Sequence, residues 1–249
     1  MGESFWQFRL YQAGDDATDI DWRQSARSRH MFVREQEWEA AESVWIWCDL
    51  SPSMRFRSGR RVPHKVERAA VLSLALGAML VRGGERIALL GSGERSRGGR
   101  QGLNAFARSL GASERAAAPL PPPVELPRFA RVALISDLLE PVEDLMGRLA
   151  GYVARGARGC LLQVVDPAEE TLPYAGRVLF EGLEAEGRAL IGNVGNVRER
   201  YVRRFTAHRE ELARQASRQG WRFAVHHTDR TAESGLLTLY QMLAPKAVR

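Results

Sequence analysis

Short apolar runs alternate with stretches of helical periodicity from Ser43 to the end of the chain. Five apolar runs predict buried strands, at residues 44–48, 86–90, 132–136, 160–165 and 222–226. Apolar residues at helical spacing predict helices between and after them, at 65–82, 103–110, 143–155, 198–219 and 233–243. Such alternation is typical of a parallel sheet with helices on both faces. The pattern therefore predicts an α/β fold with a doubly wound, mostly parallel sheet.

Two segments do not follow this alternation. Residues 174–192 hold two short apolar runs around a Glu/Gly turn, which predicts a β-hairpin insertion. Residues 1–42 are aromatic and charged, and Trp6, Phe8 and Leu10 alternate as on a strand. We expect residues 1–42 to form an N-terminal lobe packed on a main domain at 43–249. Trp22 follows Ile20 at strand spacing and is expected to be the buried anchor of this lobe, with a partner surface as the alternative.

The composition is that of a soluble globular protein. Of the 249 residues, 45% are hydrophobic and 27% charged, which excludes a disordered or collagen-like chain. The only two cysteines, Cys48 and Cys160, stand in apolar runs, so we expect reduced thiols and a reducing compartment. The first residues lack the pattern of a signal peptide, and the longest uncharged stretch, 69–81, is too short to span a bilayer. These features predict a cytoplasmic protein, whether or not Met1 is the natural start.

The formal net charge of +6 comes almost entirely from arginine, since Lys65 and Lys246 are the only lysines. Clustering of basic residues on one face would indicate nucleic-acid binding. Here the arginines are scattered among Asp and Glu, as in the predicted helix 198–219. This mixture favours a solvated surface, and we do not expect nucleic acid as a partner.

Candidate metal ligands follow two of the predicted strands. Asp49, Ser51 and Ser53 come directly after the first strand, and Asp137 ends another. In an open α/β sheet, ligands bind outside the carboxyl ends of the strands where the winding reverses. One carboxylate and two hydroxyls on such a turn can converge on a hard cation such as Mg²⁺. The alternative is that Ser51, Ser53 and Asp137 only cap turns and helices. The spacing alone leaves both interpretations open.

The spacing Asp-x-Ser-x-Ser after an apolar strand, followed later by Leu-Ile-Ser-Asp, resembles the metal-ion-dependent adhesion site of the von Willebrand factor A fold. The upstream stretch YQAGDDATDIDWRQSARSRHMFVREQEWE before CDLSPSM is similar to the bacterial family called domain of unknown function 58. LPYAGRVLFEG and GWRFAVHHTD are similar to it as well, so the resemblance spans nearly the whole chain.

The resemblance implies a von Willebrand A-like, Rossmann-type fold, a metal site made of Asp49, Ser51, Ser53 and Asp137, and association with a MoxR-type AAA+ ATPase. The adhesion site normally adds a threonine, and this chain has none between Asp21 and Glu170. Ser92, Ser96 or a water could substitute, or the site could be empty. We therefore expect weak Mg²⁺ binding and no other cofactor.

Two classes of function are compatible with these residues. The first is a non-enzymatic interaction or assembly module, modulated by Mg²⁺, whose partner is a MoxR-type AAA+ ATPase or its client. The alternative is a metal-dependent nuclease or phosphatase, because Asp49, Asp137, Asp166 and Asp229 all end predicted parallel strands. Asp166 and Asp229 stand in good turn or cap settings, so the interaction module is the preferred hypothesis.

Overall fold

The chain forms two compact units, residues 1–41 and 42–249. The computed structural model describes residues 6–10, 22–26, 30–36, 43–113, 118–184 and 187–244. The division lies next to the boundary expected between the lobe and the main domain. The packing of the lobe on the main domain stays a prediction.

The N-terminal unit contains a small antiparallel sheet. Strand β1 (Trp6–Leu10) pairs with β2 (Phe32–Gln36), so the strand expected from alternating residues 6, 8 and 10 is confirmed. Between them in sequence lies α1 (Trp22–Ser25), one turn long, and the hydroxyl of Ser25 accepts a hydrogen bond from the Phe32 amide at 2.9 Å.

Within its own unit Trp22 is 64% exposed, and its expected role as an anchor of the lobe on the main domain stays a prediction. Trp22 begins a helix and does not continue a strand from Ile20, which itself lies outside the described residues. Helical residues do not alternate between two faces as strand residues do. The burial expected for Trp22 from its strand spacing to Ile20 therefore has no basis in this helix.

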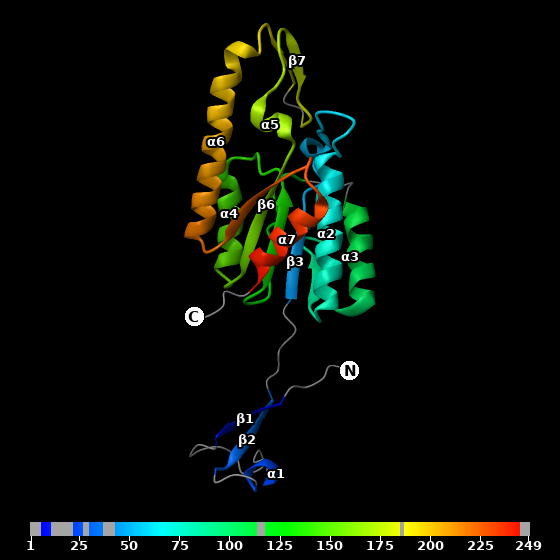
Figure 1. Cartoon of the computed structure of the whole chain (residues 1–249), viewed down its shortest axis with the longest axis vertical. Coiled ribbons are helices and arrows are strands. Elements are labelled where there is room, and N and C mark those ends of the chain that lie inside the picture. The colour runs from blue at the N-terminus through cyan, green and yellow to red at the C-terminus, as the bar shows by residue number, and fades with distance from the viewer. Residues whose placement is uncertain are drawn as a thin grey trace. The chain divides into compact units, whose positions relative to one another are not determined.

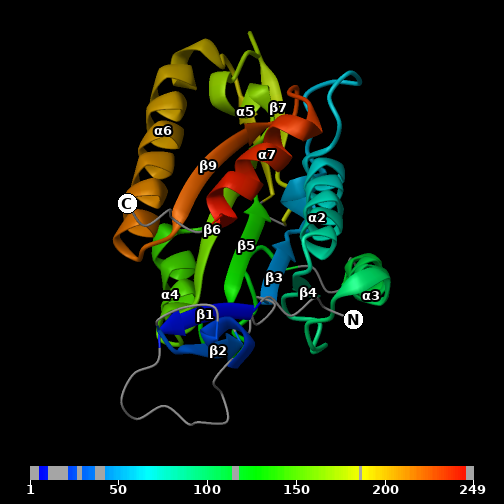
Figure 2. The same ribbon diagram turned by 60° about the horizontal axis from the view of Figure 1, so that its bottom comes forward.

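The main unit is built on a five-stranded parallel sheet in the order β4-β3-β5-β6-β9 (Figures 1 and 2). The strands are β3 (Ser43–Cys48), β4 (Arg86–Leu89), β5 (Arg131–Ser136), β6 (Arg158–Val165) and β9 (Arg222–His227). The chain adds β4 on one side of β3 and then crosses to add β5 on the other. The winding direction therefore reverses between β3 and β5, and in this class of fold ligands bind at that point.

Helices cover both faces of the sheet, as the sequence pattern predicts. One face carries α2 (Lys65–Arg82), α3 (Gly99–Ser113) and α7 (Ala232–Leu243), and the other carries α4 (Val142–Val153) and α6 (Gly195–Arg218). An apolar core lies between the sheet and the helices on each face. In strand β5, Ala133 and Ile135 belong to the core on the α2 face, while Val132 and Leu134 belong to the core on the α4 face. Every residue from 132 to 135 is buried, which explains the continuous apolar run.

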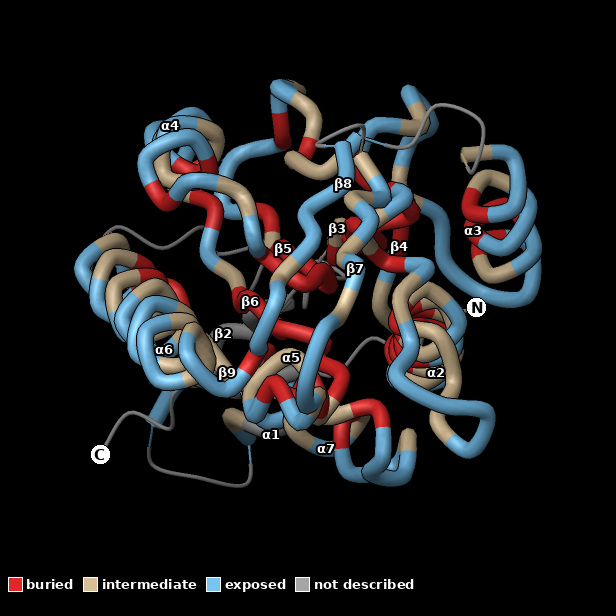
Figure 3. The backbone as a smooth tube through the Cα atoms, turned by 90° about the horizontal axis from the view of Figure 1, so that it is seen from above, coloured by how far each residue is buried: buried red, intermediate tan, exposed pale blue. Residues whose placement is uncertain are grey.

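The predicted hairpin insertion is present. Strands β7 (Val178–Glu181) and β8 (Arg188–Ile191) pair antiparallel. Figure 3 views the main unit from the end that carries the hairpin, and there β7 and β8 lie over β3 and β5. The guanidinium of Arg198 on α6 donates hydrogen bonds to the carbonyls of Leu172 and Tyr174, and thereby fixes the segment that leads into the hairpin.

Two short helices at the carboxyl edge escape the sequence prediction. The 3-10 helix η2 (Pro52–Arg55) follows β3, and α5 (Pro167–Thr171) follows β6. In α5 the Asp166 carboxylate accepts from the Ala168 amide, and the Glu169 carboxylate accepts from the Asp166 amide. This reciprocal capping box, with proline at the first helical position, stabilises a helix of only one turn.

Cys48 and Cys160 are both free and buried, on β3 and β6, with β5 between them. The expectation of separate, unpaired thiols is confirmed. Within the described part of the chain, no helix has both the length and the apolar character needed to cross a membrane.

Candidate functional site

The two carboxylates predicted to face one point come from neighbouring strands. The Asp49 amide donates to the Ile135 carbonyl at 2.9 Å and so extends the β3–β5 ladder one residue past the end of β3. This pairing brings Asp49 beside the end of β5, where Asp137 follows Ser136. The charge of Asp137 acts on Asp49 and is one cause of its raised pKa.

Asp49 is fully buried, and hydrogen bonds reach both of its oxygens. Oδ1 accepts from the Ser51 amide at 2.8 Å, and Oδ2 accepts from the Ser136 hydroxyl at 2.6 Å. Burial, reinforced by the charge of Asp137, raises the pKa of Asp49 to about 7, although the bonds from Ser136 and Ser51 oppose this. The environment of Asp49 therefore favours a bound proton or another positive charge near neutral pH.

The hydroxyls of Ser51 and Ser53 lie 3.1 Å apart, next to Asp49 in the chain. Ser51 occupies the N-cap position of η2, but its hydroxyl makes no capping hydrogen bond. Ser51 is buried and Ser53 half-buried. The Ser51 hydroxyl therefore does not cap η2 but shares a hydrogen bond with the Ser53 hydroxyl, and the metal interpretation stays a prediction.

Lys65, the first residue of α2, is a member of the site that the sequence analysis missed. Its ammonium lies 2.9 Å from Oδ2 of Asp137 and 2.5 Å from Oε1 of Glu169. Burial alone would lower the pKa of Lys65, but the two carboxylates outweigh it and raise this pKa. A signal was present: Lys65 is one of only two lysines in a chain that otherwise uses arginine.

Glu169 and Asp166 stand at the start of α5 and have different roles. Burial raises the pKa of Glu169, although its ion pair with Lys65 opposes the rise. Asp166 is fully buried, and its oxygens accept backbone hydrogen bonds from Ala168 and Ser58, at 2.9 Å and 2.8 Å. Asp166 is thus engaged in holding a helix end and a loop. Asp229 lies exposed in the turn after β9.

The turn that follows Asp137 holds an unusual backbone conformation. Leu138 has a positive φ of 52°, and its amide donates to the Ser136 hydroxyl at 3.0 Å. A leucine in this left-handed region costs roughly 1–2 kcal/mol. Such conformations cluster at functional sites, because the surrounding structure must hold them in place. Ser136, also missed in the sequence analysis, bonds both to this turn and to Asp49.

A carboxylate from the hairpin insertion also reaches the site. Oε1 of Glu184 accepts a hydrogen bond from the Ser53 amide at 3.2 Å. The two residues are 131 positions apart in the sequence, so no local pattern could pair them. The insertion therefore contributes a side chain to the predicted metal-binding turn.

The donor set fits a magnesium-type cation, since carboxylate and hydroxyl oxygens are the ligands that Mg²⁺ takes in proteins. Among the described residues, no group of three or more His, Cys, Asp and Glu side chains could hold a metal ion. A cation here would have to use the serine hydroxyls together with Asp49 and Asp137. Ser92, a possible replacement for the absent threonine, donates to the Leu89 carbonyl and accepts from the Glu94 amide within its own turn.

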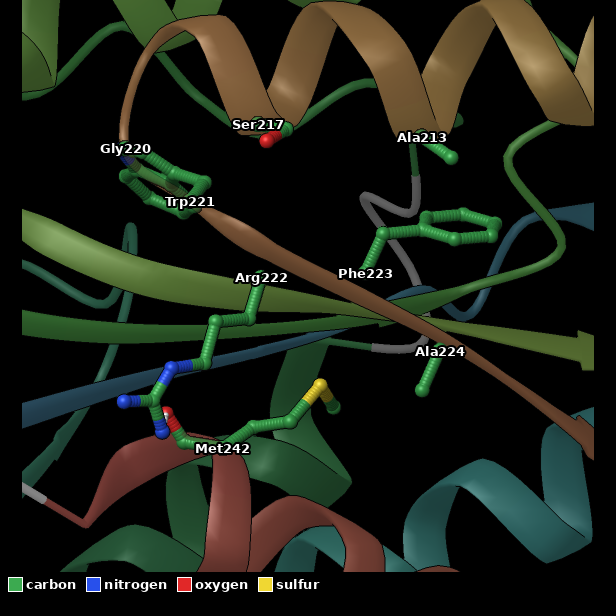
Figure 4. A pocket seen from close by; sticks show the side chains of 8 residues that line it. All are labelled: Ala213, Ser217, Gly220, Trp221, Arg222, Phe223, Ala224 and Met242. Carbon is green, nitrogen blue, oxygen red and sulfur yellow. Dashed lines mark hydrogen bonds between the residues drawn. The ribbon is translucent and has the colours of Figure 1, made fainter. Parts of the chain in front are cut away.

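Two open depressions of about 510 Å³ each are lined by other residues than these carboxylates. The first runs along β9 between α6 and α7 and is lined by residues such as Trp221, Phe223 and Met242 (Figure 4). Its one charged side chain, Arg222, donates to carbonyls at the end of α7. The second is bordered by Leu50 and the proline-rich segment 118–123. Neither depression is lined by Asp49, Asp137 or Lys65.

Comparison with known proteins identifies relatives of unknown function. The family model described as "Protein of unknown function DUF58" matches residues 7–211. Uncharacterized proteins of Mycobacterium tuberculosis and Mycobacterium bovis are 28% identical to this chain, with alignments covering 83% of the chain and 68% of each relative. No solved structure gives a significant match.

Proposed function

The chain belongs to the DUF58 family, and we propose that it is a non-enzymatic protein-interaction module whose binding site at the β3–β5 switch point is modulated by Mg²⁺. Its partner in this proposal is a MoxR-type AAA+ ATPase or a client of that ATPase. The cation would be held by Asp49, Ser51, Ser53 and Asp137, in a von Willebrand A-like arrangement.

The observation that carries the proposal is the convergence of the Ser51 and Ser53 hydroxyls, 3.1 Å apart, beside the buried carboxylate of Asp49. All of these donors are oxygens. When ionised, the carboxylates of Asp49, Asp137 and Glu169 exceed the ammonium of Lys65 by two negative charges. A divalent cation would balance that excess.

Each residue would have a distinct role. Ser51 and Ser53 present hydroxyl oxygens, Asp49 holds the turn through the Ser51 amide, and Lys65 fixes the position of Asp137. A bound Mg²⁺ would supply a coordination position for a carboxylate of the partner. Few charged ligands surround that position, which favours reversible recognition of an acidic group.

The choice of partner rests on the family resemblance. The upstream segment that precedes the Asp-x-Ser-x-Ser turn is similar to that of DUF58 members, which are typically associated with MoxR-type ATPases. The module would then act as an interaction or assembly factor for such an ATPase.

A metal-dependent nuclease or phosphatase is the second candidate, and one observation favours it. The pKa of Asp49, raised to about 7 by burial and by Asp137, suits a general base near neutral pH. Against it, Asp166 already accepts two backbone hydrogen bonds, and Asp229 is exposed in a turn. Two of the four strand-end aspartates are therefore not available as ligands of a two-metal site.

The test is the binding of the full chain to an immobilised MoxR-type ATPase from the same genome, in Mg²⁺ and in EDTA. We expect Ser51→Ala to weaken the Mg²⁺-dependent binding by about tenfold or more, or about 1.4 kcal/mol. Ser92→Ala is the matched control, because its hydroxyl stays within its own turn. Equal binding in EDTA would contradict the proposal. Hydrolysis of a phosphodiester in Mg²⁺ or Mn²⁺, abolished by Asp49→Asn, would support the enzyme instead.

A further inference from the structure

A strongly basic loop follows the Asp-x-Ser-x-Ser turn directly. We call residues 55–61, with the sequence RFRSGRR, the arginine loop. Its four arginines are Arg55, Arg57, Arg60 and Arg61. All four arginines are exposed. No acidic residue lies between Asp49 and Glu67 in the sequence, so no neighbour in the chain offsets their charge.

The arginine loop is held in place by its backbone. The Ser58 amide donates to the buried Asp166 carboxylate at 2.8 Å, and the Lys65 amide donates to the Phe56 carbonyl at 3.2 Å. A third bond, from the Val62 amide to the Gly59 carbonyl, closes the turn inside the loop. In Figure 1 the segment before α2 lies at the same end of the main unit as the hairpin. The positive charges are thus presented at the edge that holds the candidate site.

Three of the four arginines, Arg57, Arg60 and Arg61, carry charges that no described carboxylate compensates. Several arginines elsewhere on the main unit are paired, such as Arg188 with Glu181, Arg203 with Glu199 and Arg209 with Glu170. The arginine loop therefore differs from the mixed-charge surface that helix α6 presents.

One carboxylate already occupies the boundary between the arginine loop and the site. Glu184 of the hairpin insertion accepts from the Ser53 amide at 3.2 Å, two residues before the loop begins. The turn can therefore receive a carboxylate supplied from outside its own stretch of chain. A partner bearing an acidic group would compete with Glu184 for this position.

We propose that the arginine loop and the turn 49–53 together form a docking surface for an acidic peptide segment of the partner. One carboxylate of the segment takes the position of Glu184 on Ser53, and further carboxylates pair with Arg57, Arg60 and Arg61. A guanidinium binds a carboxylate through two parallel hydrogen bonds. A single exposed ion pair contributes little affinity, so the surface selects segments with several acidic residues. This inference rests on the proposed function, because it names the chemistry of the partner at the same site.

The test measures the affinity of the full chain for a fluorescent decapeptide of alternating Glu and Ser, in Mg²⁺ at low salt. The triple variant Arg57→Gln/Arg60→Gln/Arg61→Gln is expected to bind at least about tenfold more weakly. The control Arg82→Gln/Arg100→Gln/Arg108→Gln removes the same charge from exposed positions at the end of α2 and on α3. Because α2 spans 18 residues, or about 27 Å, Arg82 lies far from the loop. The control is expected to change affinity less than about twofold.

A second pair of variants tests the position of Glu184. Removing its charge by Glu184→Gln is expected to strengthen peptide binding several-fold, because the internal competitor is lost. Glu181→Gln on the same hairpin is the control, since Glu181 pairs with Arg188 and does not bond to Ser53. Equal effects of the two substitutions would overturn the assignment of Glu184 as a stand-in for the partner's carboxylate.

Two results would overturn the docking surface as a whole. The first is equal weakening by the loop triple variant and the control triple variant, which would mean that only net charge matters. The second is tighter binding of a single-stranded oligodeoxynucleotide than of the peptide, with the same dependence on the loop, which would indicate a nucleic-acid surface.

The docking surface and the proposed function can fail separately. Peptide binding that depends on the loop but is equal in Mg²⁺ and EDTA would contradict metal modulation and support the docking surface. Mg²⁺-dependent binding of the ATPase that survives in the loop triple variant would contradict the docking surface and support the proposed function.

Discussion

The ammonium of Lys65 lies 2.9 Å from Oδ2 of Asp137, and both side chains are buried. Asp49, the other carboxylate of the site, has no such partner among the described basic residues; amide and hydroxyl donors reach it instead. The two aspartates therefore differ electrostatically although they end neighbouring parallel strands.

This difference gives opposite expectations for two substitutions in the absence of metal. Asp137→Ala leaves Lys65 with one carboxylate in place of two, and we expect a loss of about 3 kcal/mol in unfolding free energy, as for other broken buried ion pairs. Asp49→Asn removes a charge that Asp137 repels, so its unfolding free energy should be unchanged or up to about 1 kcal/mol higher. Urea unfolding in EDTA measures both. The opposite order would mean that Lys65 does not compensate Asp137.

The two tryptophans Trp22 and Trp221 should respond very differently to truncation. Trp22 is 64% exposed, so Trp22→Ala should change the unfolding free energy by less than about 0.5 kcal/mol. Trp221 is buried and stacks on Tyr152 with 6.5 Å between ring centroids, so Trp221→Ala should cost about 3–5 kcal/mol. Thermal or urea unfolding compares them. A large loss from Trp22→Ala would indicate that Trp22 anchors the lobe, as the sequence pattern predicts.

The two thiols should be inert in the folded protein. Burial raises the pKa of Cys48 and of Cys160 to about 12, so the reactive thiolate is scarce at neutral pH. A chromogenic disulfide reagent should label neither cysteine in the native protein and both in denaturant. Fast labelling of one thiol without denaturant would contradict its burial, and a disulfide between Cys48 and Cys160 on a non-reducing gel would contradict the order of the strands.

His226 should weaken the fold as the pH falls. Burial, with the positive charges of Arg68 and His227, lowers its pKa to about 4, although Asp229 opposes the shift. Between about pH 6.5 and 4 the unfolded chain binds a proton that the folded chain does not, so stability is lost on acidification through this window. The loss is on the order of 2 kcal/mol.

His226→Gln provides the comparison for that pH dependence, because glutamine does not titrate. Denaturation of both proteins at pH 4, 5, 6 and 7 should show the stability of the wild type falling relative to the variant below pH 6.5. A difference that stays constant with pH would show that His226 titrates normally in the fold.

Most of the main unit follows from local patterns in the sequence. The predicted helix at 65–82 is found as α2 with the same limits, and the five predicted strands are the five strands of the sheet. These elements could be predicted because each buries a continuous or periodic apolar face. Helix α5 was not predicted, because a helix of one turn is too short to show the apolar spacing of a helix. The capping box of Asp166 and Glu169 stabilises it locally.

The residues of the candidate site likewise divide into those that a local sequence pattern identifies and those that only distant contacts bring in. Asp49, Ser51, Ser53 and Asp137 could be named from their positions after buried runs. Lys65, Ser136 and Glu184 could not, because their partners lie 72, 87 and 131 residues away in the sequence. Trp22 shows the reverse error, because a strand pattern was extended into a segment where the helix α1 begins.

The central claim is tested most directly by calorimetric titration of Mg²⁺ into the wild type, Asp49→Asn, Ser51→Ala and the control Ser92→Ala. The wild type and the control should show the same weak binding, with a Kd on the order of a millimolar, equivalent to about −4 kcal/mol. Asp49→Asn and Ser51→Ala should show none. Indistinguishable heats in all four proteins would contradict a cation site at the β3–β5 switch point.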